Sequence, residues 1–233
     1  MENKGSFYSG AFIMAGLIVL GLMLPLTAKV VRSFERTVAV KGLCEMEVKA
    51  DKVIWPLVIK VAGDDLQSLY AQVNAKNKIL AAFLADGGIR PEEISTTMTS
   101  SDKMTLEYNN DWANRYILTS IMTVCTDKVD EVLALQTRQS ELLAKGVLLI
   151  QDDWNNKTIF SFEGLNDIKP GMIEKATANA RASAEKFAQD SNSRLGKIKN
   201  ASQGSFSITD RDANTPSIKT VRVVTSVSYY LSN

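Results

Sequence analysis

The chain has 233 residues, with 27 Lys and Arg against 26 Asp and Glu, two cysteines and no histidine. This length suits one large domain or two small ones, and a net charge of +1 argues against nucleic acid as a partner. The missing histidine excludes histidine-based catalytic triads and histidine-ligated zinc or haem. Two cysteines cannot build a four-thiolate metal site. We therefore expect a protein that is not an enzyme and that holds no metal or cofactor.

The amino-terminal segment is apolar. Residues 5–28 carry no charge, and residues 11–28 are almost wholly apolar. As a helix, residues 5–28 would reach about 36 Å, enough to cross a hydrocarbon core of about 30 Å. We predict that residues 1–32 are a retained membrane anchor with one transmembrane helix. The alternative is a cleaved secretory signal, which the bulky Leu26 at the cleavage position fits poorly.

The charges beside this segment leave its orientation open. Lys29, Arg32, Arg36 and Lys41 follow the segment, whereas only Lys4 and the terminal amine precede it. The positive-inside rule would then keep the rest of the chain in the cytoplasm. Long domains are translocated despite such a bias, so both orientations remain open at this point.

Strand patterns begin after the apolar segment. Residues 38–48 and 53–61 alternate between apolar and polar side chains, which predicts two strands joined by a tight turn at residues 49–51. Pro56 places the second strand at a sheet edge or at a bulge. Further strands are expected at residues 94–106, 116–125, 147–150, 158–162, 195–208 and 221–231.

Helical periodicity marks three other segments. The expected helices run from Asp64 or Asp65 to Gly87, from Asp127 to Gly146, and from Asn166 to about residue 190. The last of these has a narrow stripe of mostly alanine, which allows a helix to approach a sheet closely. Since helices in such a mixed order must cover sheet faces, the fold class is α+β, with mixed or antiparallel sheets covered by three helices. Residues 33–233 form this domain, with two lobes meeting near residues 126–165 as an alternative to one compact body.

Three motifs in this region carry a family resemblance. The run GLCEMEVKAD at residues 42–51 resembles the opening Gly-x-Gly-Glu-x-x-Val-x-Pro-Asp hairpin of the SIMPL domain family, also called DUF541. The alanine-rich run at residues 176–188, followed by RLGKI at 194–198, looks like that family's long helix and strand entry. The segment at residues 87–94 is similar to the family's Gly-Ile…Ile link. Cys44 and Ala50 stand where the family has its second glycine and its proline.

The resemblance covers residues 37–231 and implies a location and a role. Family members are mostly bacterial envelope proteins, among them a brucella periplasmic immunogen and an enterobacterial protein linked to oxidative stress. Some members assemble into ring-like or channel-like oligomers, and the family has no established catalytic residue. The resemblance therefore implies a non-enzymatic, membrane-anchored and periplasmic homo-oligomer with an envelope or stress-related role. A monomeric envelope module that binds a ligand or a protein, and an adaptor that faces the cytoplasm, are the alternatives.

Few side chains are candidates for a site. Cys44 and Cys125 form a disulfide in an oxidising periplasm, or they are two small buried hydrophobic residues. Trp112 and Trp154 lie among Asn and Asp in expected turns, where they make subunit contacts or pack onto their own domain. The oxygen-rich runs at residues 152–156 and 210–214 are interpreted as solvated turns, because neither has the ligand spacing of an EF-hand calcium loop.

Overall fold

The computed structural model describes residues 12–21, 23, 36–103, 114–150 and 156–232. The chain divides into two compact units. The first contains residues 1–46, 168–207 and 222–233, and the second contains residues 47–167 and 208–221. Residues 126–165 lie wholly within the second unit.

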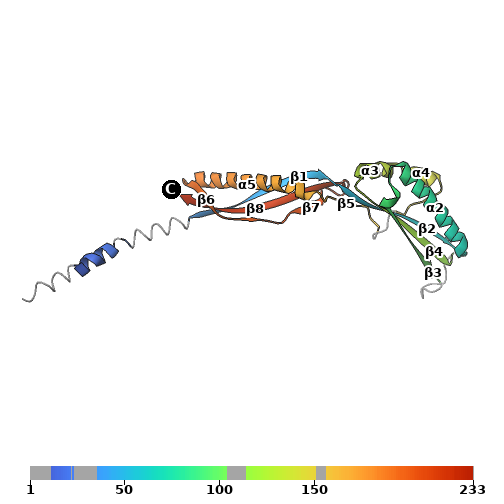
Figure 1. Cartoon of the computed structure of the whole chain (residues 1–233), viewed down its shortest axis with the longest axis horizontal. Coiled ribbons are helices and arrows are strands. Elements are labelled where there is room, and N and C mark those ends of the chain that lie inside the picture. Colours follow the sequence, from blue (N-terminus) through green and yellow to red (C-terminus); the bar gives the residue numbers. More distant parts are fainter. Residues whose placement is uncertain (1–11, 22, 24–35, 104–113, 151–155, 233) are drawn as a thin grey trace, which may run out of the picture. The chain divides into compact units, whose positions relative to one another are not determined.

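The described elements form an α+β fold with two four-stranded sheets, as expected from the sequence (Figure 1). One sheet has the order β1-β8-β6 with β7 also paired to β8, and the other has the order β3-β4-β2-β5. The strands are β1 (Thr37–Lys49), β2 (Lys52–Gly63), β3 (Ile94–Asp102), β4 (Tyr116–Thr126), β5 (Ile159–Ser161), β6 (Arg194–Gln203), β7 (Ser207–Asp210) and β8 (Ile218–Ser232). The helices are α2 (Leu66–Asp86), α3 (Val129–Thr137), α4 (Ser140–Ala144) and α5 (Leu165–Asp190), with a short 3₁₀ turn η1 at Pro91–Glu93 and a further helical stretch at residues 12–21.

Within the first unit, α5 packs on its sheet through a stripe of small side chains. Ala176, Ala180 and Ala184 are fully buried, and Ala180 and Ala184 share a cluster with Val40, Val227 and Tyr229. A side chain at Gly42 of β1 would clash with the α5 backbone, because an added Cβ would lie 1.8 Å from the carbonyl oxygen of Ala176. The helix can approach the strand this closely only because neither side contributes bulk at the contact.

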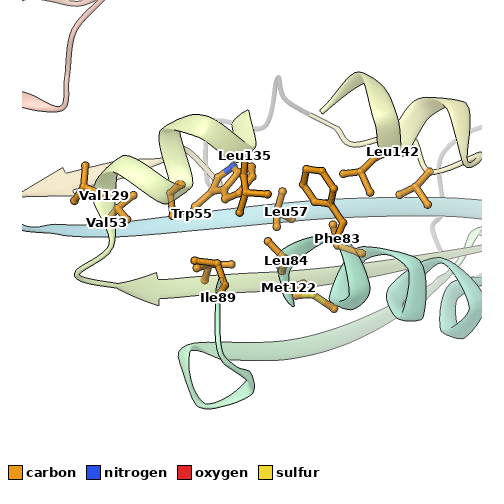
Figure 2. Packing of buried hydrophobic residues seen from close by; sticks show 14 of the residues in the cluster. Val53, Trp55, Leu57, Phe83, Leu84, Ile89, Met122, Val129, Leu135 and Leu142 are labelled. Carbon is orange, nitrogen blue, oxygen red and sulfur yellow. The ribbon is translucent and has the colours of Figure 1, made fainter. Parts of the chain in front are cut away.

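The main core of the second unit fills the space between one sheet face and helices α2, α3 and α4 (Figure 2). The inward residues of β2 alternate with outward ones, as the sequence predicts. The core side chains drawn in Figure 2 include Val53, Trp55, Leu57, Phe83, Leu84, Ile89, Met122, Val129, Leu135 and Leu142. Burying each large aliphatic side chain of this kind contributes about 1.5–3 kcal/mol.

Helix α2 begins and ends where the sequence indicates. The Asp65 carboxylate accepts hydrogen bonds from the backbone N–H groups of Gln67 and Ser68, which satisfies donors that have no partner inside the helix. Gly88, just past the end, has φ +82°, a conformation that glycine adopts without strain. Midway along α2, the Asn77 amide exchanges hydrogen bonds with the buried Ser120 hydroxyl of β4.

Several expected features of local structure are wrong. The strand expected at residues 147–150 is reduced to one bridge at Ile150, and the strand expected at residues 195–208 is divided into β6 and β7. The strands β1 and β2 do not form a hairpin, since β1 pairs with β8 and β2 pairs with β4 and β5. At the joint, the N–H of Ala50 donates to the carbonyl of Ser217 and that of Asp51 to the carbonyl of Ser161, so distant segments, and not a hairpin, determine the path of the chain there. The expected helix from Asp127 to Gly146 is broken into α3 and α4. The N-cap residue of α3 is Lys128, whereas the sequence predicted Asp127.

Pro56 lies in a part of β2 that has a described neighbouring strand on one side only. On the side of β2 away from β4, β5 pairs with residues 52–54, and Ile150 bridges to Val58. Pro56 lies between these two described partners. The missing N–H of proline therefore removes no donor from the ladder to β4. The expected edge position is wrong for the strand as a whole, because β2 is an inner strand in the order β3-β4-β2-β5.

The amino-terminal expectation falls partly outside the described residues. Residues 12–21 are helical, and their large apolar side chains are exposed, from Phe12 to Leu20. Among the residues that the structure describes, no helix combines the length and the apolar character needed to span a bilayer. The anchor over residues 11–28 stays a prediction.

We expect Gly42→Ala to destabilise the protein by about 3 kcal/mol, because the new methyl group overlaps the backbone of α5. The matched control is Gly171→Ala on α5 itself, where an added Cβ meets nothing within 4 Å. Gly171→Ala should leave stability unchanged or raise it by about 0.5–1 kcal/mol. Urea unfolding measures both, and equal midpoints for the two variants would contradict the close contact.

Candidate functional site

The edge strand β3 of the second unit is largely uncovered. Among the described residues it pairs with β4 alone, and all its residues from Ser95 to Ser101 are exposed. The strand has the sequence ISTTMTSSD, so its only charge is Asp102 at the end. Long, uncharged edge strands without proline are unusual, because they can pair with another chain.

The backbone geometry shows which groups of β3 face outward. The carbonyl of Val58 accepts from Ile150 on the side of β2 away from β4, so the odd-numbered residues of β2 bond to β4. These residues face even-numbered residues of β4, so the odd-numbered residues of β4 direct their polar groups to β3. Their partners in β3 are also odd-numbered, as the bond from the Lys103 N–H to the Arg115 carbonyl indicates. Successive residues of an antiparallel strand point their polar groups to opposite sides. Thr96, Met98 and Ser100 therefore direct N–H and C=O toward the open edge.

An apolar groove of about 450 Å³ lies beside this edge. Leu66 and Tyr70 of α2 form one wall, Met98 and Ser100 form the other, and Leu118 is also part of the lining. The expected apolar stripe of α2 includes Leu66 and Tyr70, yet the structure leaves them 46% and 55% exposed. Met98 is 38% exposed and lies on the same face of the sheet as Leu118.

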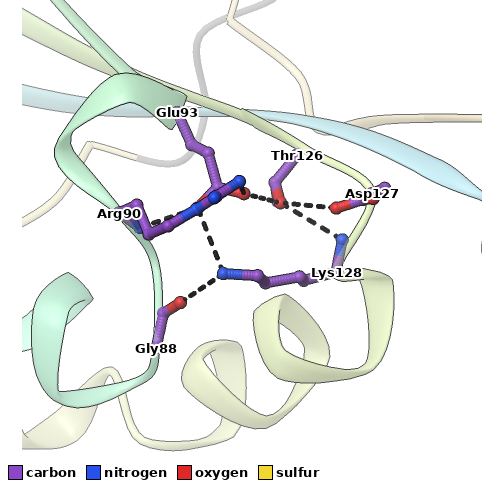
Figure 3. A network of polar contacts seen from close by, with 6 residues as sticks. All are labelled: Gly88, Arg90, Glu93, Thr126, Asp127 and Lys128. Carbon is purple, nitrogen blue, oxygen red and sulfur yellow. Dashed lines mark hydrogen bonds and ion pairs between the residues drawn. The ribbon is translucent and has the colours of Figure 1, made fainter.

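A polar cluster fixes the start of β3 (Figure 3). The Glu93 carboxylate accepts hydrogen bonds from the backbone N–H of Arg90 at 2.7 Å and from the Thr126 hydroxyl at 2.9 Å. Two further partners are the Arg90 guanidinium at 3.4 Å and the Lys128 ammonium at 3.3 Å, which also donates to the carbonyl of Gly88. One carboxylate thus connects the end of α2, the start of β3 and the start of α3.

These contacts determine the charge state of Glu93. The hydrogen bond from the Arg90 backbone, together with those from Thr126, the Arg90 side chain and Lys128, lowers the pKa of the Glu93 carboxyl to about 2, although burial opposes the shift. The side chain is only 9% exposed. Glu93 is therefore ionised at neutral pH and is a weak base, which suits a structural role better than proton transfer.

Arg115 fixes the other end of the β3–β4 pair. Its guanidinium bonds to the Asp102 carboxylate, with the shortest contact at 3.0 Å. Its backbone N–H donates to Asp64 at 2.8 Å. Both ends of β3 are therefore fixed to the fold, and its middle residues form a rigid open edge.

A second polar pocket, of about 520 Å³, opens near Cys125. Its charged groups bond mainly to each other or to the backbone. Lys52 pairs with Glu163 at 2.9 Å, which raises the pKa of the Lys52 ammonium. The Asp51 carboxylate accepts from the N–H groups of Glu163 and Gly164. These bonds fix the turn before α5 and leave little unpaired charge for a ligand.

The residues proposed from the sequence are not brought together. Cys44 is buried, Cys125 is exposed, and both are free thiols. Cys44 belongs to the first unit and Cys125 to the second, so their pairing stays a prediction. Trp112 and Trp154 lie outside the described residues, and their subunit contacts also stay predictions.

Of the two oxygen-rich runs, only the one at residues 210–214 is fully described by the structure. Residues 152–155 are outside the described range. In the other run, the Asp212 carboxylate accepts from the N–H groups of Asn214 and Thr215. Bonds from the Thr215 hydroxyl, Arg211 and Asn214 lower the pKa of Asp212 to about 2. Among the described residues, no group of acidic or cysteine side chains has the arrangement of a metal site.

We expect the stability contributed by Glu93 to depend on pH. Because its pKa is lower in the folded than in the unfolded chain, the contribution is complete above about pH 4.5 and is lost as the pH falls toward 2. A shift of this size corresponds to about 3 kcal/mol. Urea midpoints of the wild type and of Glu93→Gln at pH 7, 4 and 2.5 should differ most at pH 7 and converge at pH 2.5.

The control for that experiment is Glu92→Gln, because Glu92 is a neighbouring but exposed carboxylate. Its curve should stay close to that of the wild type at every pH. A constant difference between Glu93→Gln and the wild type from pH 7 to 2.5 would contradict the lowered pKa.

Comparison with known proteins agrees with the family resemblance. The model of the family described as "SIMPL: Protein of unknown function (DUF541)" matches residues 38–229. No curated protein matches the chain. The matched range begins in β1 and ends in β8, so it takes in both sheets and helices α2 to α5. The chain belongs to the SIMPL (DUF541) family.

Proposed function

We propose that the chain is a non-enzymatic assembly protein, anchored in a bacterial membrane through residues 11–28, whose domain lies outside the cytoplasm and forms a homo-oligomer. The open edge of β3 is the observation that carries this proposal. A rigid, exposed strand without charge in its middle offers backbone donors and acceptors for another chain, and such edges are usually blocked in proteins that stay monomeric.

The helical stretch at residues 12–21 supports the membrane part of the proposal. Its apolar side chains are exposed around the helix, with Phe12 79% and Leu17 66% exposed. Water is a poor environment for such a surface, whereas a bilayer or a bundle of equivalent helices would cover it. A ring-like or channel-like form, with an envelope or stress-related role, is the form that the sequence resemblance favours.

The polar clusters support a role without catalysis. Glu93 has a pKa of about 2, so it neither takes up nor releases protons efficiently near neutral pH. Lys52 and Asp51 are bonded within the turn before α5. In the described part of the second unit, these groups stabilise turns and strand ends.

The apolar groove favours one second candidate, a monomeric module that binds an envelope ligand or protein. Its volume of about 450 Å³ is within the range of small-molecule sites. The two candidates differ in mass. Self-assembly gives a large species whose mass depends on concentration, whereas the binding module stays a monomer.

We predict one large species when the full-length protein is purified in mild detergent and measured by size exclusion with light scattering. A chain starting at Ser33 is measured in parallel. A large species in both samples assigns assembly to the domain, and one in the full-length chain alone assigns it to the amino-terminal segment. Monomers in both samples would overturn the homo-oligomer.

We also predict that a reporter fused after Asn233 is active outside the cytoplasm. Paired fusions, one to an enzyme that works only in the periplasm and one to a protein that fluoresces only in the cytoplasm, give opposite signals in the same strain. A cytoplasmic signal would contradict the proposed orientation and would favour the cytoplasm-facing adaptor.

A further inference from the structure

The open edge of β3 is complementary to itself. Met98 is the middle residue of Ile94–Asp102, and its N–H and C=O are among those that point away from β4. If two copies of β3 lie antiparallel with Met98 opposite Met98, all nine residues of the strand pair. Thr96 then faces Ser100, and Thr97 faces Thr99. Hydroxyl side chains opposite each other stabilise antiparallel strands.

The charges at the two ends of the strand favour the antiparallel direction. Glu92 precedes β3 and Lys103 follows it, while Glu93 is paired with Lys128 and Asp102 with Arg115 inside each copy. Antiparallel pairing places Glu92 of one copy near Lys103 of the other, whereas parallel pairing would place each of these charges beside its own equivalent. This complementarity is a property of the chain with itself, which argues for a second copy rather than an unrelated peptide as the occupant.

The apolar groove beside β3 would add buried apolar surface to the same strand pairing. Side chains of Thr96, Met98 and Ser100 lie on the face of the sheet that α2 covers. A two-fold axis perpendicular to the sheet keeps both copies of α2 on that face. The two Met98 side chains then lie next to each other, and the apolar grooves of the two copies become continuous across the new strand pair.

From these observations we propose that two copies of this chain associate through antiparallel pairing of their β3 strands, with Met98 on the two-fold axis. The inference rests on the proposed self-assembly and identifies the surface that carries it. Two sheets of order β3-β4-β2-β5 become one continuous sheet. The unpaired N–H and C=O groups of Thr96, Met98 and Ser100 gain partners in the second copy.

Disulfide trapping tests both the surface and the register. The full-length protein in mild detergent carries Cys125→Ser, so that the exposed native thiol is removed, together with Met98→Cys. Opposed residues of a hydrogen-bonded pair have Cα atoms about 5.5 Å apart, within the range of a disulfide. Mild oxidation should therefore give a covalent dimer.

The matched control is Thr96→Cys in the same background, since Thr96 is also exposed and lies on the same face and edge. In the proposed register it lies four residues away from its own equivalent, about 14 Å along the strand, so no disulfide-linked dimer should form. Thr96→Cys combined with Ser100→Cys should again give covalent dimers, because these two positions face each other.

A second variant tests the edge without cysteine chemistry. Met98→Pro removes an N–H that points away from β4, so the ladder to β4 is kept, and Met98→Lys adds a charge typical of blocked edges. Both should reduce the mass of the assembly, while Met98→Leu should not. Circular dichroism checks that each variant is folded.

The outcomes separate the two proposals. A large assembly in which Met98→Cys does not crosslink, or in which Met98→Pro and Met98→Lys keep the full mass, overturns the β3 pairing and leaves self-assembly standing on another surface. Crosslinking of Thr96→Cys in place of Met98→Cys overturns the register. A monomeric wild type overturns both proposals and leaves a segment of another protein as the occupant of the edge.

Discussion

The carboxylate of Glu93 is the interaction on which the exposed edge of the second unit depends. Glu93 lies just before β3, and its carboxylate is bonded to Arg90 in the turn that follows α2, to Thr126 at the end of β4 and to Lys128 before α3. A strand with one open side has few contacts to hold its position. The Glu93 cluster holds one end of β3 and the Arg115–Asp102 pair holds the other, while the side of the strand away from β4 stays exposed.

The two units solve the problem of helix-on-sheet packing differently. In the first unit, alanines of α5 face Gly42, so the backbones approach closely and little apolar volume is needed. In the second, large side chains such as Trp55 and Phe83 fill a thicker layer between sheet and helices. Near the edge of this sheet, α2 leaves Leu66 and Tyr70 partly uncovered beside β3.

Local patterns predicted much of this fold. Alternation identified β1 and β2, Asp64 or Asp65 and Gly87 marked the limits of α2, and the alanine stripe of α5 is buried as expected. The hairpin between β1 and β2 was wrong because strand pairing depends on distant segments, here Ser161 and Ser217. The break between α3 and α4 was missed because residues 136–141 contain no glycine or proline that would mark the end of a helix.

The candidate site was largely invisible in the sequence. Ser and Thr residues in β3 are typical of an ordinary strand, and only the registers through β4 to β2 show which of its amides face outward. The Glu93 cluster joins residues up to 40 positions apart, so no spacing rule indicates it. The tryptophans and cysteines stood out by residue type alone, and the structure does not join them into a site.

The outward direction of the even-numbered amides of β3 has a consequence for stoichiometry. When a strand edge pairs with its own copy around a two-fold axis, the β3 edges of both chains are occupied by the same contact. This contact therefore joins two chains and cannot add a third. Any larger ring or channel built on it must use a second, different surface. Its subunit number must then be even.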